Sequence, residues 1–156
     1  MDQLTIKPIT NATDIITIIH AAFKRYESDP IPSSALAETA ETIKENVASG
    51  TEIFAAYKSD TLVGIMKVTK QLQSLYFSRL SVLPSYQNQG IATALINYLN
   101  TLAAERNVST IQCKVRKSEQ DNIRLYKKLG YDIISEEITM SPTGYAIETV
   151  TMQKEL

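Results

Sequence analysis

RLSVLPSYQNQGIAT, residues 79–93, is the stretch that decides the fold of this 156-residue chain. Its first half alternates and stops at a proline, and a short polar turn leads to Gly90. Directly after the glycine, apolar residues recur at i, i+3, i+4, i+7, i+8, i+11 and i+12, starting from Ile91. The stretch therefore predicts a strand, a tight turn and a long amphipathic helix, which is the start of a strand-helix-strand crossover.

The same periodicities extend outward from this stretch to both ends of the chain. Strands are expected at residues 4–9, 52–58, 62–69, 74–83, 110–115, 132–140 and 145–153. Helices are expected at residues 14–26, 36–47, 91–103 and 120–129. The order is β-α-α-β-β-β-α-β-α-β-β. Hairpins require antiparallel pairing and the crossover gives one parallel pair, so we predict a mixed α/β (α+β) fold. Its central sheet has about seven strands, mostly antiparallel and flanked by helices.

Composition and charge narrow the class of protein. The chain is 44% hydrophobic and 21% charged, which suits a single globular domain over residues 1–156. No basic, apolar start marks a signal peptide, no apolar run is long enough to span a membrane, and a single cysteine excludes an internal disulfide. We therefore expect a cytoplasmic protein without membrane contact. The formal net charge of −1 and the lack of a basic stripe argue against nucleic acid.

The turn before the long helix has the chemistry of a phosphate site. The first turn of a helix offers unpaired N–H groups and a partial positive charge. Gly90 lets an anion approach the backbone, Ala92 is small for a similar reason, and Gln87 and Gln89 add neutral donors. A glycine at a helix start is more often an ordinary cap, and neither G-x-G-x-x-G nor G-x-x-x-x-G-K-[ST] is present.

Two motifs together carry a family resemblance. The segment RLSVLP followed by Gln87-x-x-Gly90-x-Ala92 resembles motif A of the GNAT acetyltransferases, Q/R-x-x-G-x-G/A. About thirty residues later, LYKKLGY (residues 125–131) resembles the second signature of that family, L-Y-x-x-x-G-F/Y. The order of elements matches as well, so the resemblance covers nearly the whole chain. It implies the GNAT fold and an N-acetyltransferase that uses acetyl-CoA as acetyl donor, without a metal.

The resemblance also assigns a cofactor site. Backbone groups around Leu80 and Val82 would bind the pantetheine arm, and the amides that follow would hold the pyrophosphate. The strands that end near Val82 and Val115 would splay to admit the thioester. Glu119 stands where the family often has asparagine, so Asn122 either contacts the cofactor from a shifted place or only caps its helix or faces solvent. The expected cofactor-binding residues are Leu80, Ser81, Val82, Gln87, Asn88, Gln89, Gly90, Ile91, Ala92, Thr93 and Asn122.

Tyr126 matches the general acid of the family. A phenol is a weaker acid than a thiol, so Tyr126 would act mainly as a hydrogen-bond donor to the leaving thiolate. The alternative is that Tyr126 packs in the core with Ile123 and Leu129. Cys113 alternates with apolar residues in a predicted strand, which favours a core position over a role as nucleophile.

The acceptor is less defined by the sequence. Glu27, Asp29 and Glu38 flank a proline-containing loop that the resemblance places beside the acceptor cleft, so they are candidate substrate contacts or bases, and they favour cationic amines. The acceptor is a small-molecule or peptide amine, attacked directly in a ternary complex. Open alternatives are a non-catalytic acyl-CoA sensor and a protein N-terminal or lysine acetyltransferase. Homodimers through strand edges are common in the family, and the sequence leaves open whether this chain forms one.

Overall fold

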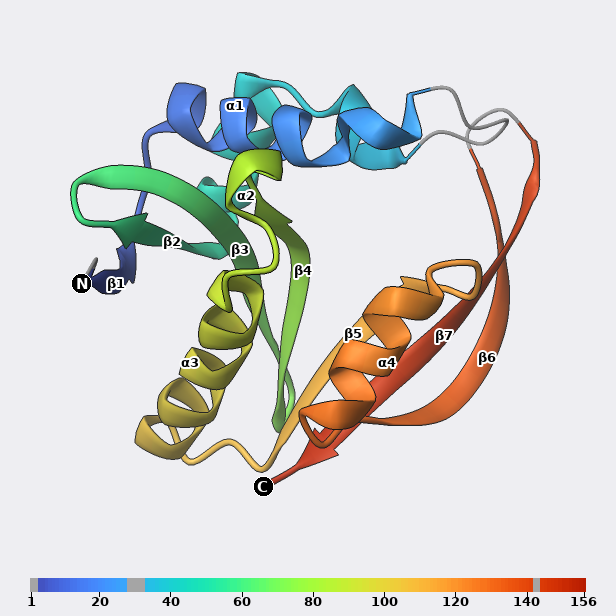
Figure 1. Cartoon of the computed structure of the whole chain (residues 1–156). Coiled ribbons are helices and arrows are strands. Elements are labelled where there is room, and N and C mark those ends of the chain that lie inside the picture. The colour runs from blue at the N-terminus through green and yellow to red at the C-terminus, as the bar shows by residue number, and fades with distance from the viewer. Residues whose placement is uncertain (1–2, 28–32, 142–143) are drawn as a thin grey trace. The chain divides into compact units, whose positions relative to one another are not determined.

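The computed structural model describes residues 3–27, 33–141 and 144–156 (Figure 1). These residues form a mixed α/β fold in which four helices flank a seven-stranded sheet of order β1-β2-β3-β4-β5-β7-β6. The strands are β1 Leu4–Pro8, β2 Glu52–Lys58, β3 Thr61–Gln71, β4 Ser74–Val82, β5 Thr110–Arg116, β6 Asp132–Met140 and β7 Ala146–Glu155. The helices are α1 Ala12–Phe23, α2 Ala40–Ala48, α3 Ile91–Glu105 and α4 Gln120–Lys128. Short 3₁₀ turns η1, η2 and η3 cover Lys24–Tyr26, Ser34–Ala37 and Pro84–Tyr86.

Strand pairing confirms the mixed sheet. β1 with β2, β2 with β3, β5 with β7, and β6 with β7 are antiparallel. The crossover through α3 makes β4 and β5 parallel, with Ser74 opposite Thr110 and Tyr76 opposite Gln112. Both the predicted order of elements and the predicted parallel pair are therefore confirmed. Of the helices described, none combines the length and the apolar composition that a membrane span needs.

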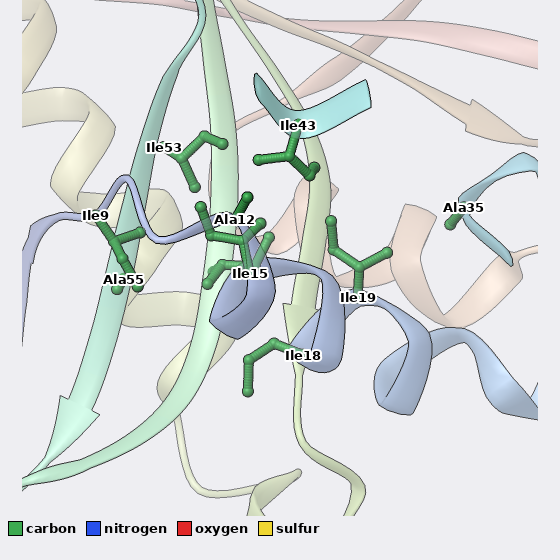
Figure 2. Packing of buried hydrophobic residues seen from close by; sticks show 10 residues of the cluster. Ile9, Ala12, Ile15, Ile18, Ile19, Ala35, Ile43, Ile53 and Ala55 are labelled. Atoms are coloured by element: carbon green, nitrogen blue, oxygen red, sulfur yellow. The ribbon is translucent and has the colours of Figure 1, made fainter. Parts of the chain in front are cut away.

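The chain divides into two compact units, and each is described by itself. The first contains Met1–Thr69 and Phe77–Tyr98, and the second contains Lys70–Tyr76 and Leu99–Leu156. The core of the first unit lies where α1 and α2 cover β2 and β3 (Figure 2). Ile15 and Ile19 of α1 and Ile43 of α2 are fully buried there with Ile65 of β3. Ile15 and Ile19 are four residues apart, so they lie on the same face of α1 and make the side that packs on the sheet apolar.

The second helix begins later than predicted, and Leu36 lies outside it. Thr39 caps α2 through a reciprocal pair of bonds with Thr42, which fixes the first helical residue at Ala40. Glu38, just before this cap, has an extended backbone with ψ of 145°. Leu36 therefore falls in the separate turn η2, and its place in the predicted helix 36–47 was wrong because the cap overrode the apolar spacing.

The second unit packs α4 and the strands β5 and β7 around a buried aromatic residue. Ile111 and Cys113 of β5, Met152 of β7 and Tyr131 are all buried. Tyr131 follows α4, and its amide donates to the carbonyl of Tyr126 at 2.9 Å. This bond ends the helix and directs the Tyr131 ring into the core.

Candidate active site

The turn that precedes α3 is anchored to the sheet of the first unit. The amide of Leu83 donates to the Val63 carbonyl of β3 at 2.9 Å, and Tyr86 closes η3 by donating to Leu83 at 2.8 Å. The side-chain amide of Gln87 donates to the Val82 carbonyl at 3.3 Å. Gln87 thus ties the turn to the end of β4, a role that its place in the motif does not by itself reveal.

The backbone of this turn takes the left-handed conformation twice. Asn88 has φ of 62° and Gly90 has φ of 81°, a region that glycine and asparagine tolerate best. A Cβ built on Gly90 would meet no heavy atom of the described residues within 4 Å, so the backbone there is open to approach. Gly90 then accepts the first helical bond, from Ala94 at 3.0 Å. The two left-handed residues, Asn88 and Gly90, therefore lead the chain directly from the turn into the helix.

The N-terminus of α3 therefore presents a set of donors. Amides in the first turn, at Ile91, Ala92 and Thr93, have no acceptor within the helix. The helix is 15 residues long with no acidic residue in its first turn, so its partial positive charge at this end is not cancelled locally. This geometry fits a pyrophosphate, since its oxygens could accept from several of these amides at once.

Lys58 is a neighbour of this turn that the sequence motifs did not include. Its ammonium donates to the side-chain oxygen of Gln89 at 2.6 Å and lies 5.9 Å from the centre of the Tyr86 ring. Lys58 ends β2 and is 31 residues away from Gln89 in the chain, so no local pattern connects the two. The contact adds a positive charge beside the predicted phosphate site.

The strand that leads into the turn is irregular at Arg79. Its φ of 52° breaks the extended geometry of β4, and the buried hydroxyl of Ser81 donates to the Arg79 carbonyl at 2.8 Å. Gly64 of β3 faces this segment, and a Cβ on it would lie 2.9 Å from the Ser81 carbonyl oxygen. A side chain at position 64 would therefore push β3 away from the predicted pantetheine-binding residues Leu80, Ser81 and Val82.

The second motif lies in the second unit. Tyr126 is 6% exposed on the inner side of α4, and its ring centre lies 6.2 Å from that of Tyr131. Asn122, one turn earlier, is half-buried. The burial of Tyr126 is compatible with packing and also with a hydroxyl directed at a bound thiol, so its role stays a prediction. The turn and Tyr126 belong to different units, and the predicted opening between the later parts of β4 and β5 also stays a prediction.

Cys113 lies in the core of the second unit. It is 2% exposed, and burial raises the pKa of its thiol to about 12. Burial also raises the pKa of the Tyr131 hydroxyl above its ordinary value, with a smaller contribution from Cys113. A thiol with so high a pKa is almost wholly protonated at neutral pH, which makes it a poor nucleophile. This environment favours the core position that the sequence suggested.

The three acidic residues expected near the acceptor do not share one environment. Glu27 follows η1 and is exposed, while Asp29 lies outside the described residues. The Glu38 carboxylate contacts the ammonium of Lys67 and, at 2.7 Å, Nε of Arg79. Neither cation was predicted to contact Glu38, because they lie on β3 and β4, far along the chain.

Comparison with known proteins decides the family. A model of the acetyltransferase (GNAT) family matches residues 16–131, most of the chain. The chain belongs to the GNAT acetyltransferase family. No curated protein sequence matches it. The resemblance to this family, and the fold that it implied, are therefore confirmed.

Solved GNAT structures share the fold at low sequence identity. The ribosomal-protein-S18-alanine N-acetyltransferase of Escherichia coli superposes with a TM-score of 0.73 at 21% identity, over 98% of this chain and 94% of that one. A GNAT acetyltransferase of Elizabethkingia anophelis with acetyl-CoA bound gives 0.74 at 20% identity over the full length of both. A putative acetyltransferase of Salmonella typhimurium with its cofactor acetyl-CoA gives 0.75 at 14%, over 99% of this chain and 94% of that one.

Proposed function

We propose that this GNAT protein is an acetyl-CoA-dependent N-acetyltransferase that moves an acetyl group to a primary amine by direct attack in a ternary complex. The observation that supports this most is the turn before α3, where two left-handed residues open a 15-residue helix beside the ammonium of Lys58. Family membership and two structural neighbours with acetyl-CoA add to it.

Within this proposal the first unit holds the cofactor. Amides from Asn88 to Thr93 bind the pyrophosphate, Gln87 and Gln89 line its rim, and Lys58 supplies a positive charge. Backbone groups of Leu80, Ser81 and Val82 bind the pantetheine arm as an added strand would. Bound acetyl-CoA supplies an acetyl group activated as a thioester. Asn122 remains a candidate contact from the second unit.

The chemistry requires a neutral amine and a stabilised leaving thiolate. An alkyl amine with a pKa near 10.4 is neutral in only about one molecule in two thousand at pH 7. A base, directly or through water, must take its proton while the new N–C bond forms and the C–S bond breaks. The Val82 amide would stabilise negative charge on the acetyl oxygen, and the Tyr126 hydroxyl would donate a hydrogen bond to the departing sulfur. Glu27, Asp29 and Glu38 stay candidates for the base or for contacts to the acceptor.

Two measurements on the intact chain test this function. Calorimetry with acetyl-CoA tests binding, and thiol release from acetyl-CoA with a panel of amines tests transfer. The panel includes small amines, peptides with a free N-terminus and peptides whose only amine is lysine. We expect binding together with amine-dependent thiol release. If acetyl-CoA binds tightly but no amine of the panel causes thiol release, an acyl-CoA sensor is favoured. If only the peptides cause thiol release, a protein acetyltransferase is favoured.

Tyr126→Phe tests the predicted hydrogen bond to the sulfur. Removing the hydroxyl should lower kcat about 10²-fold or somewhat less while leaving the Kd for acetyl-CoA nearly unchanged, because the bond forms in the transition state. Single-turnover kinetics and calorimetry separate the two effects. A folded Tyr126→Phe variant with full single-turnover rate would assign Tyr126 to the core alone.

Cys113→Ala tests the alternative route through an acetyl-enzyme. We expect most activity to be retained, because the buried thiol is protonated at neutral pH and takes no part. The loss of a buried side chain should lower the free energy of unfolding by about 1 kcal/mol. A variant that folds but has lost transfer would favour a covalent intermediate on Cys113. A cytoplasmic location stays a prediction, and sedimentation would measure whether the chain forms a homodimer.

A further inference from the structure

A buried polar cluster in the first unit joins four elements. Its centre is the Glu38 carboxylate, which contacts the ammonium of Lys67 on β3 and Nε of Arg79 on β4, the latter at 2.7 Å. Asn46 of α2 accepts from Lys67 at 2.7 Å, and Ser34 of η2 accepts from Nη2 of Arg79 at 3.0 Å. We call these five residues the Glu38 cluster.

The backbone around Glu38 is fixed as well. Nε2 of His20 on α1 donates to the Glu38 carbonyl at 2.8 Å, and the Glu38 amide donates to Ala35 at 3.3 Å. Both ends of the residue are therefore held, and its carboxylate cannot swing toward an acceptor without leaving two cations unpaired. In this position the Glu38 carboxylate orients the Arg79 guanidinium.

The charges of the Glu38 cluster do not balance. Among the described residues it contains two cations, Lys67 and Arg79, and one carboxylate, while Asn46 and Ser34 are neutral. The side chains of Lys67 and Glu38 are only 8% and 11% exposed, so an excess positive charge there is poorly hydrated. One singly charged anion would neutralise it, whereas a doubly charged phosphate would overshoot.

Arg79 is the member that can reach such an anion. Its side chain is 27% exposed, the most of the three charged residues. Its side-chain hydrogen bonds use Nε and Nη2, and Nη1 donates no hydrogen bond to any of the described residues. A guanidinium has five N–H donors in a planar fork that suits a carboxylate.

The position of Arg79 in β4 relates this anion to the proposed reaction. Arg79 precedes Val82 by three residues, which is no more than about 10 Å of strand. Its left-handed backbone, with φ of 52°, redirects the strand just before the segment that we propose binds the cofactor. A carboxylate at Arg79 and an amine at the acetyl group are therefore separated by a distance that a small amino acid can span.

We infer that Arg79 recognises a carboxylate of the acceptor, so that the preferred substrate is an amine that carries an acid group. This inference rests on the proposed function and names its substrate class. It reverses the cationic preference that the acidic residues of the sequence suggested. Positive charge beside the acceptor also lowers the pKa of its amine, which raises the neutral, reactive fraction.

The test uses ω-amino acids from glycine to 6-aminohexanoic acid, each matched with its carboxamide. The rate of thiol release from acetyl-CoA gives kcat/KM for each amine. Each value is divided by the neutral fraction of that amine, so that differences in pKa between the free amines cancel. At one or more chain lengths the acid should exceed its amide by about 10-fold or more, the value of a charged hydrogen-bonded pair. Amides that equal or exceed the acids at every length would overturn the inference, while the transferase proposal would stand.

A binding measurement separates the two proposals further. Calorimetry of the same acids and amides is carried out on protein saturated with coenzyme A. If no acceptor is turned over, the transferase proposal fails. Acid-selective binding would then still support recognition of a carboxylate at Arg79. Equal binding of acids and amides would overturn that inference as well.

Arg79→Gln locates the effect on the guanidinium. The variant leaves Glu38 and Lys67 as a balanced pair, so it should fold. It should lose about 10-fold or more in kcat/KM for the best acid and less than about 3-fold for the matching amide. Lys44→Gln removes one positive charge from the exposed side of α2 and is the matched control, with no expected change in selectivity. Equal losses for acid and amide in Arg79→Gln would assign the residue a structural role only.

Discussion

The turn before α3 and the Glu38 cluster are two polar regions of the same unit, built in opposite ways. The turn uses consecutive residues, 87–93, and the residues from Gln87 to Gly90 are exposed. The cluster brings together residues from η2, α2, β3 and β4, and the side chain of its lysine is 8% exposed. A site made of backbone amides needs only a short sequence, whereas a buried ion pair exists only once the fold has formed.

This difference predicts that changes in the turn weaken cofactor binding at little cost in stability, whereas removing the Glu38 carboxylate lowers stability and leaves cofactor binding nearly unchanged. Gly90→Glu should produce the largest effect on acetyl-CoA binding, about 10³-fold or more in Kd. A carboxylate near a phosphate costs about 4 kcal/mol at an effective dielectric constant near 20. Calorimetry measures the loss, and thermal unfolding should show a folded protein, because no atom of the described residues would clash with the new Cβ.

Gly90→Asn is the control for backbone strain. Asparagine tolerates positive φ and carries no charge, so its Kd should rise by about 10-fold or less. If the asparagine variant loses as much affinity as the glutamate variant, the loss comes from the backbone and not from repulsion. If neither loses affinity, the pyrophosphate does not bind at this turn.

Glu38→Ala should have the opposite profile. It leaves Lys67 and Arg79 without their carboxylate, and an unpaired buried charge lowers the free energy of unfolding by about 3 kcal/mol. Urea unfolding measures this loss, while the Kd for acetyl-CoA should change less than about 3-fold because the turn is built separately. Adding Lys67→Met to Glu38→Ala should restore part of the stability. Failure of this second change to restore any would show that charge is not the cause.

Lys58→Met should have the smallest effect, since it removes one half-buried charge beside the turn. The Kd for acetyl-CoA should rise about 3-fold to 10-fold at low salt, and the difference should shrink at high salt as ions screen the charge. Lys7→Met is the matched control, because Lys7 also lies over an aromatic ring of the first unit, 4.7 Å from the centre of Tyr57. An equal rise in both variants would indicate a general charge effect rather than a contact at the turn.

Most of the fold could be predicted from periodicity. The strands at Glu52–Lys58 and Asp132–Met140 were predicted with their observed bounds, and the long helix begins at Ile91 as expected. The apolar spacing that marks these elements is also what buries them, so sequence and packing agree. The start of α2 was missed because the Thr39 cap determines it. In this cap Thr39 and Thr42 each accept a hydrogen bond, through the side-chain hydroxyl, from the backbone amide of the other.

By itself the sequence determined the order of elements, the parallel pair through α3 and the family to which the chain belongs. These follow from local patterns, because a turn with glycine and a helix with one apolar face are properties of neighbouring residues. Only the tertiary structure decided that Glu38 holds Arg79 and Lys67, and that Lys58 lies beside Gln89. Such contacts join residues 29 to 41 positions apart, and side-chain charge alone does not specify which opposite charges meet when the strands pair.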